Sequence, residues 1–308
     1  MRIDVRRFVT LVVAMAIAGS FGMSSTSVLA SSGGNGTTSD VTNGGTNPSG
    51  PSQSATWTSA QSQIYANKLQ GLSRVSAAFG TPASHAYVPL GLSQGSVKTL
   101  LCPQTTSTLC GPPTSASVPD YNTNEPNGYY GYQCGPTVGH NALGAYGVNI
   151  AIGTGSYPNA TSLTQEMRTT SSNGTDRTYM PYALNRHQTQ DTYVWQTLGT
   201  PAGNPNGAAD LLNYTVDDIW FKDSPIYNIE TYGYDPIVGA YRYPISQWSG
   251  VDIRHYIAAY AYSSSGSYIS ITDSAVKYSY TAPQRYTQYY ENIWAAVHNH
   301  PLLDAILW

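Results

Sequence analysis

The chain has 308 residues, of which only 10% are charged, and its formal net charge is −3. A mildly acidic chain that is poor in lysine lacks the basic surface on which nucleic-acid binding rests, so we expect no nucleic-acid partner. Tyrosine and glycine are abundant, with 26 and 29 residues. The tyrosines are typical of amphipathic strand and surface positions, or alternatively of a groove that binds carbohydrate or peptide.

The first 30 residues predict a secretory signal peptide. Arginines at positions 2, 6 and 7 precede a mostly apolar stretch, and Val28-Leu29-Ala30 has the pattern of a cleavage site. The apolar stretch is short and interrupted by glycine and serine, which favours cleavage over a membrane-spanning helix. We therefore expect a secreted, extracellular protein. Contact with a membrane is expected only if the segment stays uncleaved and acts as an anchor.

Residues 31–54 predict a disordered linker. The segment consists mainly of serine, glycine, threonine and asparagine, and Val41 is its only large aliphatic residue. Such a composition buries too little apolar surface to offset the entropy lost on ordering. The remaining residues divide into an N-terminal extension of one helix and loops at 55–116, and a domain at 117–308.

Hydrophobic periodicity and turn residues predict the secondary structure along the chain. We expect helices at 59–72, directly after Cys134, and at 163–168, 179–187, 215–222 and 288–297, the fifth opening on a capping signal at Thr215. We expect strands at 226–232, 255–262 and 267–272, with Ser-Ser-Ser-Gly as the turn between the last two. Because helices come mainly first and strands mainly last, the order predicts an α+β fold with a segregated sheet.

Three residues far apart in the chain indicate a nucleophilic site. Cys134 precedes Gly-Pro and a short helix, where the helix dipole favours a thiolate. His255 opens one predicted strand and Asp273 ends the next, so a hairpin brings the two together. A thiol, an imidazole and a carboxylate are what a cysteine nucleophile needs. The alternative for Cys134 is a buried, inert thiol.

The other two cysteines flank a short loop. Cys102 and Cys110 can form a disulfide in an oxidising compartment, which leaves Cys134 as the odd thiol. His298 and His300 have no cysteine or acidic partner at the spacing of a zinc site. We therefore expect no metal and no cofactor.

Together these motifs resemble the papain-like cysteine peptidase superfamily, in particular the branch similar to bacteriocin-processing (double-glycine leader) peptidases. The resemblance covers residues 117–290. It rests on Val118-Pro119-Asp120-Tyr121, on Cys134-Gly135-Pro136-Thr137, on the helix and strand at 215–232, and on His255-Tyr256 through Asp273. It implies a papain-like fold, in which N-terminal helices pack on a C-terminal antiparallel sheet. It also implies that Cys134 is the nucleophile, His255 the general acid and base, and Asp273 the carboxylate that orients His255.

The chain departs from the family at the oxyanion site. Family members commonly carry a glutamine shortly before the cysteine, and its side chain helps to bind the oxyanion. The comparable stretch here offers Asn122 and Asn124, whose amides can donate in its place. Gln133 is adjacent to Cys134, which is the wrong geometry for a side chain that shares this site with the Cys134 backbone N–H.

The sequence thus predicts a secreted thiol hydrolase, a monomeric cysteine peptidase that cleaves a peptide or protein substrate through a thioester acyl-enzyme. Two alternatives stay open. One is a catalytically inert papain-like module for extracellular binding, favoured by the missing glutamine, the many tyrosines and the linker. The other is a cell-wall peptide amidase or acyl transferase, which uses the same three residue types.

Overall fold

A computed structural model describes residues 57–79, 112–126, 132–198, 207–263, 267–275, 284–300 and 305–308. The predicted signal peptide, the predicted linker and the Cys102–Cys110 pairing lie outside these residues. The pairing stays a prediction that peptide mapping under non-reducing conditions tests. Within the described ranges, no helix is both long enough and apolar enough to span a membrane.

The strands form one large antiparallel sheet and one small hairpin. The seven-stranded sheet has the order β2-β9-β3-β6-β7-β8, and β1 pairs with β6 beside this path. Its strands are β1 (Ala116–Ser117), β2 (Trp195–Thr197), β3 (Ile226–Glu230), β6 (Arg254–Ser263), β7 (Tyr268–Asp273), β8 (Gln284–Tyr289) and β9 (Ala305–Leu307). The hairpin consists of β4 (Gly233–Asp235) and β5 (Ala240–Arg242).

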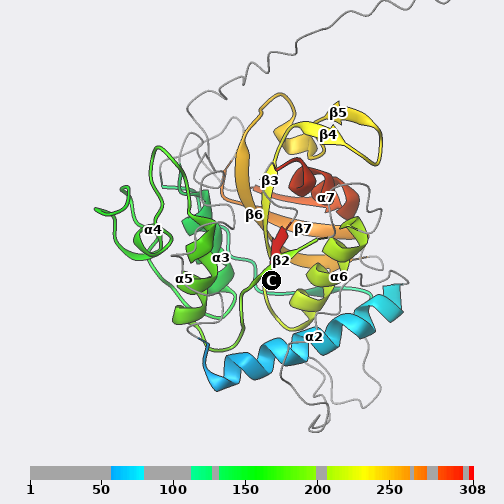
Figure 1. The fold of residues 1–308 in the computed structure, drawn as a ribbon, viewed down its shortest axis with the longest axis horizontal. Coiled ribbons are helices and arrows are strands. Elements are labelled where there is room, and N and C mark those ends of the chain that lie inside the picture. The colour runs from blue at the N-terminus through cyan, green and yellow to red at the C-terminus, as the bar shows by residue number, and fades with distance from the viewer. Residues whose placement is uncertain are drawn as a thin grey trace, which may run out of the picture.

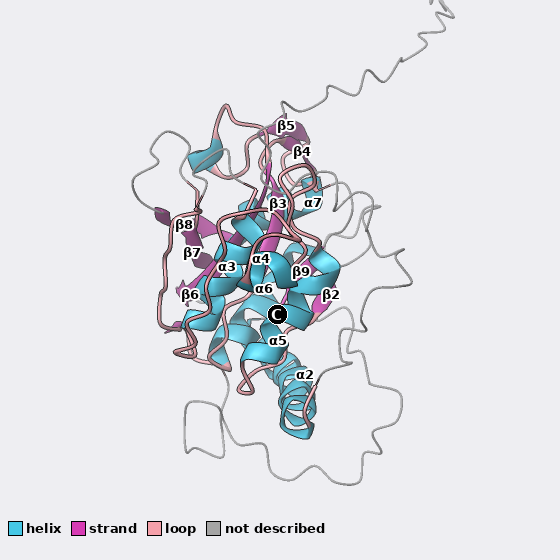
Figure 2. Cartoon of the chain, turned by 90° about the vertical axis from the view of Figure 1, so that its left-hand side faces the viewer, coloured by secondary structure: helices cyan, strands magenta, loops and turns pink. Residues whose placement is uncertain are grey.

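Helices lie on both sides of the sheet (Figures 1 and 2). They are α2 (Ser59–Phe79), α3 (Cys134–Gly144), α4 (Ser162–Glu166), α5 (Met180–His187), α6 (Gly207–Trp220) and α7 (Tyr290–Asn299), with 3-10 turns at Arg177–Tyr179 and Ser246–Trp248. Figure 1 shows α3, α4 and α5 on one side of the strands and α6 and α7 on the other, while α2 crosses below. The mixed helices and antiparallel sheet confirm the α+β class.

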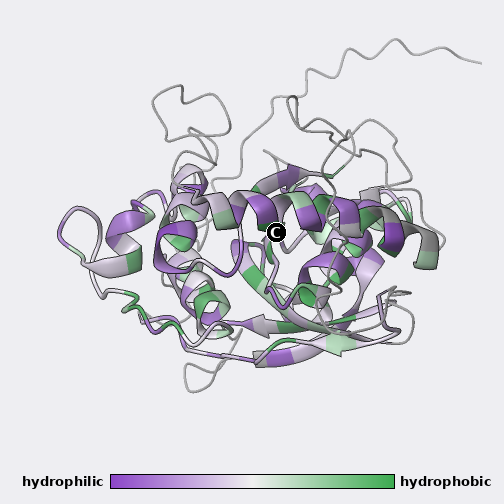
Figure 3. Ribbon diagram, turned by 90° about the horizontal axis from the view of Figure 1, so that it is seen from below, coloured by the Kyte–Doolittle hydropathy of each residue, from purple (hydrophilic) through white to green (hydrophobic). Residues whose placement is uncertain are grey.

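Alternating residues of the central strands build two separate cores. On β3 and β6, Tyr227 and Ile257 belong to the cluster that contains residues of α6 and α7. Their neighbours Ile226 and Tyr256 belong to the cluster that contains residues of α3, α4 and α5. Successive side chains of a strand point to opposite faces, so the centre of the sheet is buried on both sides. In Figure 3, polar and apolar residues alternate along α2 where it crosses the view, as expected of a helix that packs on one face.

Helices α2 and α6 are each longer than the sequence predicts. Helix α2 continues past Gly71 to Phe79 instead of ending at residue 72. A Cβ at Gly71 would overlap the Asp217 side chain, so the glycine permits a close approach to α6. Helix α6 begins at Gly207, well before the predicted start at Thr215. The Thr215 hydroxyl donates to the carbonyl of Leu211 inside the helix, so it does not cap the N-terminus.

In the C-terminal third, the predicted hairpin is present, but the last helix starts later than predicted. Strands β6 and β7 pair antiparallel as predicted, and Asp273 ends β7. The predicted helix at 288–297 begins only at Tyr290, because residues 284–289 form β8 and extend the sheet beside β7. Strand β8 was missed, and it supplies a residue of the site described next.

Candidate active site

Cys134 is the first residue of α3. It is fully buried and forms no disulfide within the described structure. The two residues that follow Cys134 suit the start of this helix. A Cβ at Gly135 would overlap Thr175, so only glycine permits this contact. Pro136 lies in the first helical turn, where its missing N–H costs no hydrogen bond.

His255 and Asp273 form a buried pair. The Nε2 atom of His255 lies 2.6 Å from Oδ1 of Asp273, and the side chains are 0% and 1% exposed. His255 is the second residue of β6, and Asp273 is the last residue of β7. The antiparallel pairing of these strands therefore places the pair as the sequence predicted.

Three further groups donate hydrogen bonds to Asp273. The indole N–H of Trp248 is 3.1 Å and the hydroxyl of Tyr286 is 2.8 Å from Oδ2, and the backbone N–H of Ala275 is 3.0 Å from Oδ1. Burial, followed by the charge of Asp273, raises the pKa of Tyr286 well above its usual value, so the tyrosine stays a donor. These bonds fix the carboxylate, and the carboxylate in turn fixes the imidazole.

The other ring nitrogen of His255 remains available. Nδ1 is buried and has no hydrogen-bond partner among the described residues, so the thiol of Cys134 does not donate to it in this conformation. The Trp248 ring lies 5.1 Å from the imidazole, centroid to centroid, and packs beside it. Trp248 thus packs against the imidazole of His255 and also donates a hydrogen bond to Asp273, the carboxylate that holds the imidazole.

The elements that carry Cys134 and His255 are in contact. Helix α3 packs against β6, and Cys134 shares a hydrophobic cluster with Tyr256, the residue after His255. Tyr256 and His255 point to opposite faces of β6, so this contact does not by itself place the imidazole beside the sulfur, and Cys134 and His255 are not hydrogen bonded.

The segment before Cys134 runs along the sheet and ends at α3. It begins with β1, which pairs with β6. Farther along, the Thr272 hydroxyl donates to the carbonyl of Tyr121, and the N–H of Glu125 donates to the carbonyl of Ser274 at 3.1 Å. These bonds place Glu125 between the end of β7 and the start of α3.

The Glu125 side chain binds the N-terminus of α3. It is 3% exposed, and its Oε1 accepts the backbone N–H of Gln133 at 2.5 Å. Burial raises the pKa of Glu125 well above its usual value, and the charge of Asp273 adds to this rise. Hydrogen bonds from the backbone N–H groups of Gln133 and Cys134 oppose it. The sequence interpretation missed Glu125, although it directly follows one of the candidate asparagines.

Asn122 and Asn124 are the amides that the sequence offers as oxyanion donors. Both polar atoms of the Asn122 side chain are buried without a hydrogen-bond partner among the described residues. The roles of Asn122 and Asn124 as oxyanion donors stay predictions. The Gln133 amide nitrogen donates to the carbonyl of Gly153 and to the hydroxyl of Thr164, at 2.5 and 2.9 Å. Gln133 therefore anchors a neighbouring loop, in line with the geometry expected from its place in the sequence.

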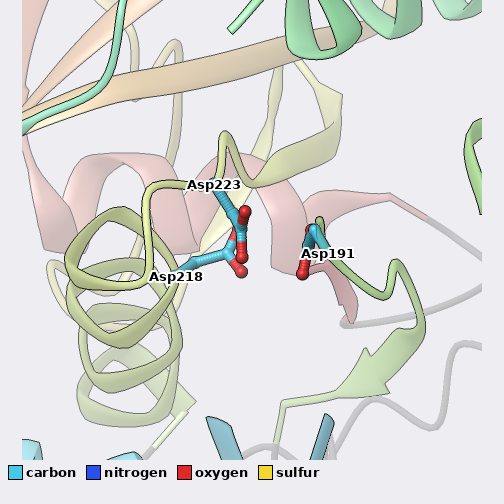
Figure 4. Close-up of side chains that lie close together, drawn as sticks. All are labelled: Asp191, Asp218 and Asp223. Carbon is cyan, nitrogen blue, oxygen red and sulfur yellow. The ribbon is translucent and has the colours of Figure 1, made fainter. Parts of the chain in front are cut away.

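A second buried cluster of charges lies where α2 meets α6. The ammonium of Lys68 lies 3.0 Å from Asp191, 2.5 Å from Asp218 and 3.3 Å from Asp223, and all four side chains are at most 1% exposed. Figure 4 shows the carboxylates of Asp218, on α6, and of Asp223, just after α6, close together, with that of Asp191 facing them from another segment. The hydroxyl of Tyr146 also donates to Asp223. Lys68 thereby attaches α2 to the sheet domain.

The protonation of this cluster follows from its burial. Burial raises the pKa of Asp218 to about 7 even though Lys68 lowers it, and burial also raises that of Asp223. One carboxylate oxygen from each of the three aspartates lies within 4.8 Å of the others, which is a spacing suited to a metal ion. The Lys68 ammonium already supplies a positive charge at this point, so we assign the cluster a structural role.

Comparison with known proteins does not assign the chain to a family. No family model matches it, and neither a curated protein nor a solved structure matches it significantly. The functional assignment therefore rests on the residues and their geometry.

Proposed function

We propose that this protein is a secreted thiol hydrolase, a cysteine peptidase that acts on a peptide or protein substrate. One observation carries the proposal. A buried imidazole, His255, is held at one nitrogen by Asp273 and is unpartnered at the other, and Glu125 links the residue after Asp273 to the start of the helix that begins with Cys134. A general base needs such an arrangement, because one nitrogen fixes the ring while the other exchanges a proton.

The proposed reaction proceeds in two steps. The proton of Cys134 passes to Nδ1 of His255, and the thiolate attacks the substrate carbonyl carbon, whose π electrons move to oxygen. When the oxyanion collapses, the bond to the leaving amine breaks, and His255 returns its proton to that amine. Water, deprotonated by His255, then attacks the thioester carbonyl carbon, the carbon–sulfur bond breaks to release the acid, and the Cys134 sulfur takes the proton back from His255. If an amine replaces water, the same acyl-enzyme supports acyl transfer, and a cell-wall peptide as substrate would make the protein an amidase.

The site must open for this reaction. Cys134 and His255 are both 0% exposed. A substrate carbonyl therefore reaches the sulfur only after a local movement that also brings the sulfur within hydrogen-bonding distance of Nδ1. Catalytic hydrogen bonds are often long before substrate binds.

A small activated ester tests the proposal without knowledge of the substrate. We expect 4-nitrophenyl acetate to acylate Cys134 with a burst of nitrophenol, and we expect Cys134→Ser and His255→Ala to abolish the burst while circular dichroism stays unchanged. Asp273→Asn should leave a small residual rate, because Asp273 orients the ring without exchanging its proton. His140→Ala is the control: its Nδ1 lies 2.7 Å from the carbonyl of Ile150, and the burst should persist. A full burst in His255→Ala would refute the mechanism.

A binding module is the second candidate, and the hairpin β4–β5 favours it. Tyr234 is 48% exposed and Tyr241 is 69% exposed, and their rings lie 5.5 Å apart. Ile237 and Val238, at the tip, are also exposed. Exposed aromatic and aliphatic side chains that cluster on one element are typical of an interaction surface. Lack of a burst, together with binding to peptidoglycan or to immobilised peptide that Tyr241→Ala removes, would favour this function.

A further inference from the structure

Glu125 lies at the N-terminus of α3, where the proposed thiol hydrolase would bind the oxyanion. The N–H groups at the start of a helix have no intrahelical partner, and in an acyl transfer they stabilise the negative oxygen of the intermediate. Here a carboxyl group engages this end of the helix: Glu125 accepts the N–H of Gln133 at 2.5 Å, and the neighbouring N–H of Cys134 favours its charged form. A carboxylate at this position keeps the donors engaged and repels a developing oxyanion.

Protonation would change the chemistry of this position. A neutral carboxylic acid has an O–H donor and a weaker acceptor, so it can donate to the oxyanion and release the backbone N–H groups. The surroundings favour the neutral form. Glu125 is 3% exposed, and Asp273 adds a negative charge nearby.

The elements that meet near Glu125, which are α3 and the sheet strands β6, β7 and β8, carry several titratable groups. The Cys134 thiol lies on α3, the His255 imidazole on β6 and Asp273 on β7, while Tyr286 of β8 donates to Asp273. Among them, His255 is needed for thiolate formation. The test must therefore separate oxyanion stabilisation from thiolate formation.

We propose that Glu125 is the oxyanion-site residue of this hydrolase and that it supports catalysis only in its protonated form. Hydrolysis is then confined to pH values at which Glu125 is not ionised. This inference rests on the proposed function. In the acylation step, the thiolate forms the bond to carbon and the carbonyl π pair moves to oxygen. The Glu125 O–H donates a hydrogen bond to that oxygen and keeps its proton. The leaving group departs with the proton of His255.

Two reagents make the test specific. Acylation by 4-nitrophenyl acetate passes through an oxyanion, whereas alkylation by iodoacetamide is a displacement without one. Both need the same thiolate and the same opening of the site, so the ratio of the two rates at Cys134 isolates the oxyanion contribution. We expect this ratio in the wild type to fall by roughly 10²-fold or more as the pH rises and Glu125 ionises, which is the loss of one oxyanion donor.

Two variants complete the test. Glu125→Gln carries an amide donor that does not titrate, so its ratio should be independent of pH and should exceed the wild-type ratio by roughly 10²-fold at alkaline pH. Glu125→Ala has no side-chain donor and leaves the backbone N–H groups free, so its ratio should be independent of pH and lower than that of Glu125→Gln. If Glu125→Gln does not fold, the wild-type profile alone decides, because a constant wild-type ratio contradicts the inference.

The outcomes also separate this inference from the proposed function. Acylation that depends on Cys134, but with the same ratio in the wild type and Glu125→Gln at every pH, would overturn the role of Glu125 alone. An absence of acylation at Cys134 in both proteins at every pH would overturn the proposed function and the inference with it.

Discussion

The buried cluster around Lys68 makes the strongest prediction about stability. Lys68→Met removes the ammonium, keeps a side chain of similar length and leaves Asp191, Asp218 and Asp223 buried together. Breaking a buried ion pair by removal of one partner costs about 3–5 kcal/mol, because the other charge stays uncompensated. We expect the free energy of unfolding to fall by about this amount at pH 8.

The loss should shrink as the pH falls. In the wild type, the pKa of Asp218 is raised from 3.8 to about 7. Because the folded protein binds this proton more tightly than the unfolded chain does, protonation of Asp218 stabilises the fold. This stabilisation is complete below pH 3.8 and is lost as the pH rises through 7. Without Lys68 the pKa rises further. Each additional pKa unit for Asp218 in Lys68→Met lowers the free energy of unfolding by about a further 1.4 kcal/mol at alkaline pH. It has no effect at a pH where Asp218 is protonated in both the variant and the wild type.

Urea unfolding followed by tryptophan fluorescence measures both effects. Trp220 and Trp248 are almost fully buried and report on the core. Lys222→Met is the matched control, because Lys222 is exposed, and it should change the free energy of unfolding by less than about 0.5 kcal/mol. A loss below about 1 kcal/mol for Lys68→Met at pH 8, or an equal loss at pH 8 and pH 5, would refute the reasoning.

Two further predictions concern the site. Tyr286→Phe removes one hydrogen bond from the carboxylate that holds the imidazole, and it should lower the free energy of unfolding by about 1.5–3 kcal/mol. Tyr268→Phe, at an exposed position of the same sheet, should be neutral in urea unfolding, and equal effects of the two would contradict this account. Gly135→Ala forces a methyl group against Thr175 and should cost about 1–3 kcal/mol in the same measurement. Gly155→Ala, whose new Cβ would meet only ordinary contacts, should be tolerated, and a stable Gly135→Ala protein would show that Thr175 moves aside.

Local pattern in the sequence was enough to predict several elements. The Gly-Pro after Cys134 predicted a helix start, and α3 begins at Cys134. Alternating apolar residues on either side of a Ser-Ser-Ser-Gly turn predicted the β6–β7 hairpin, and the hairpin alone brings His255 to Asp273. These features were predictable because helix starts and hairpins are determined by residues that are close in the chain.

Partners that are distant in the chain were decided by the tertiary structure. Glu125 looks like an ordinary loop residue until the bonds of its segment to β6 and β7 carry it to the N-terminus of α3. Tyr286 reaches Asp273 only because β8 pairs with β7. Lys68 is buried because two segments distant from it, the loop at Asp191 and the end of α6 with the turn after it, supply three aspartates around it, and its own helix gives no sign of them. The sequence by itself was enough to select Cys134, His255 and Asp273 as the candidate thiol, imidazole and carboxylate. The packing of distant segments decided which groups surround them, since burial and charge depend on neighbours that local periodicity does not encode.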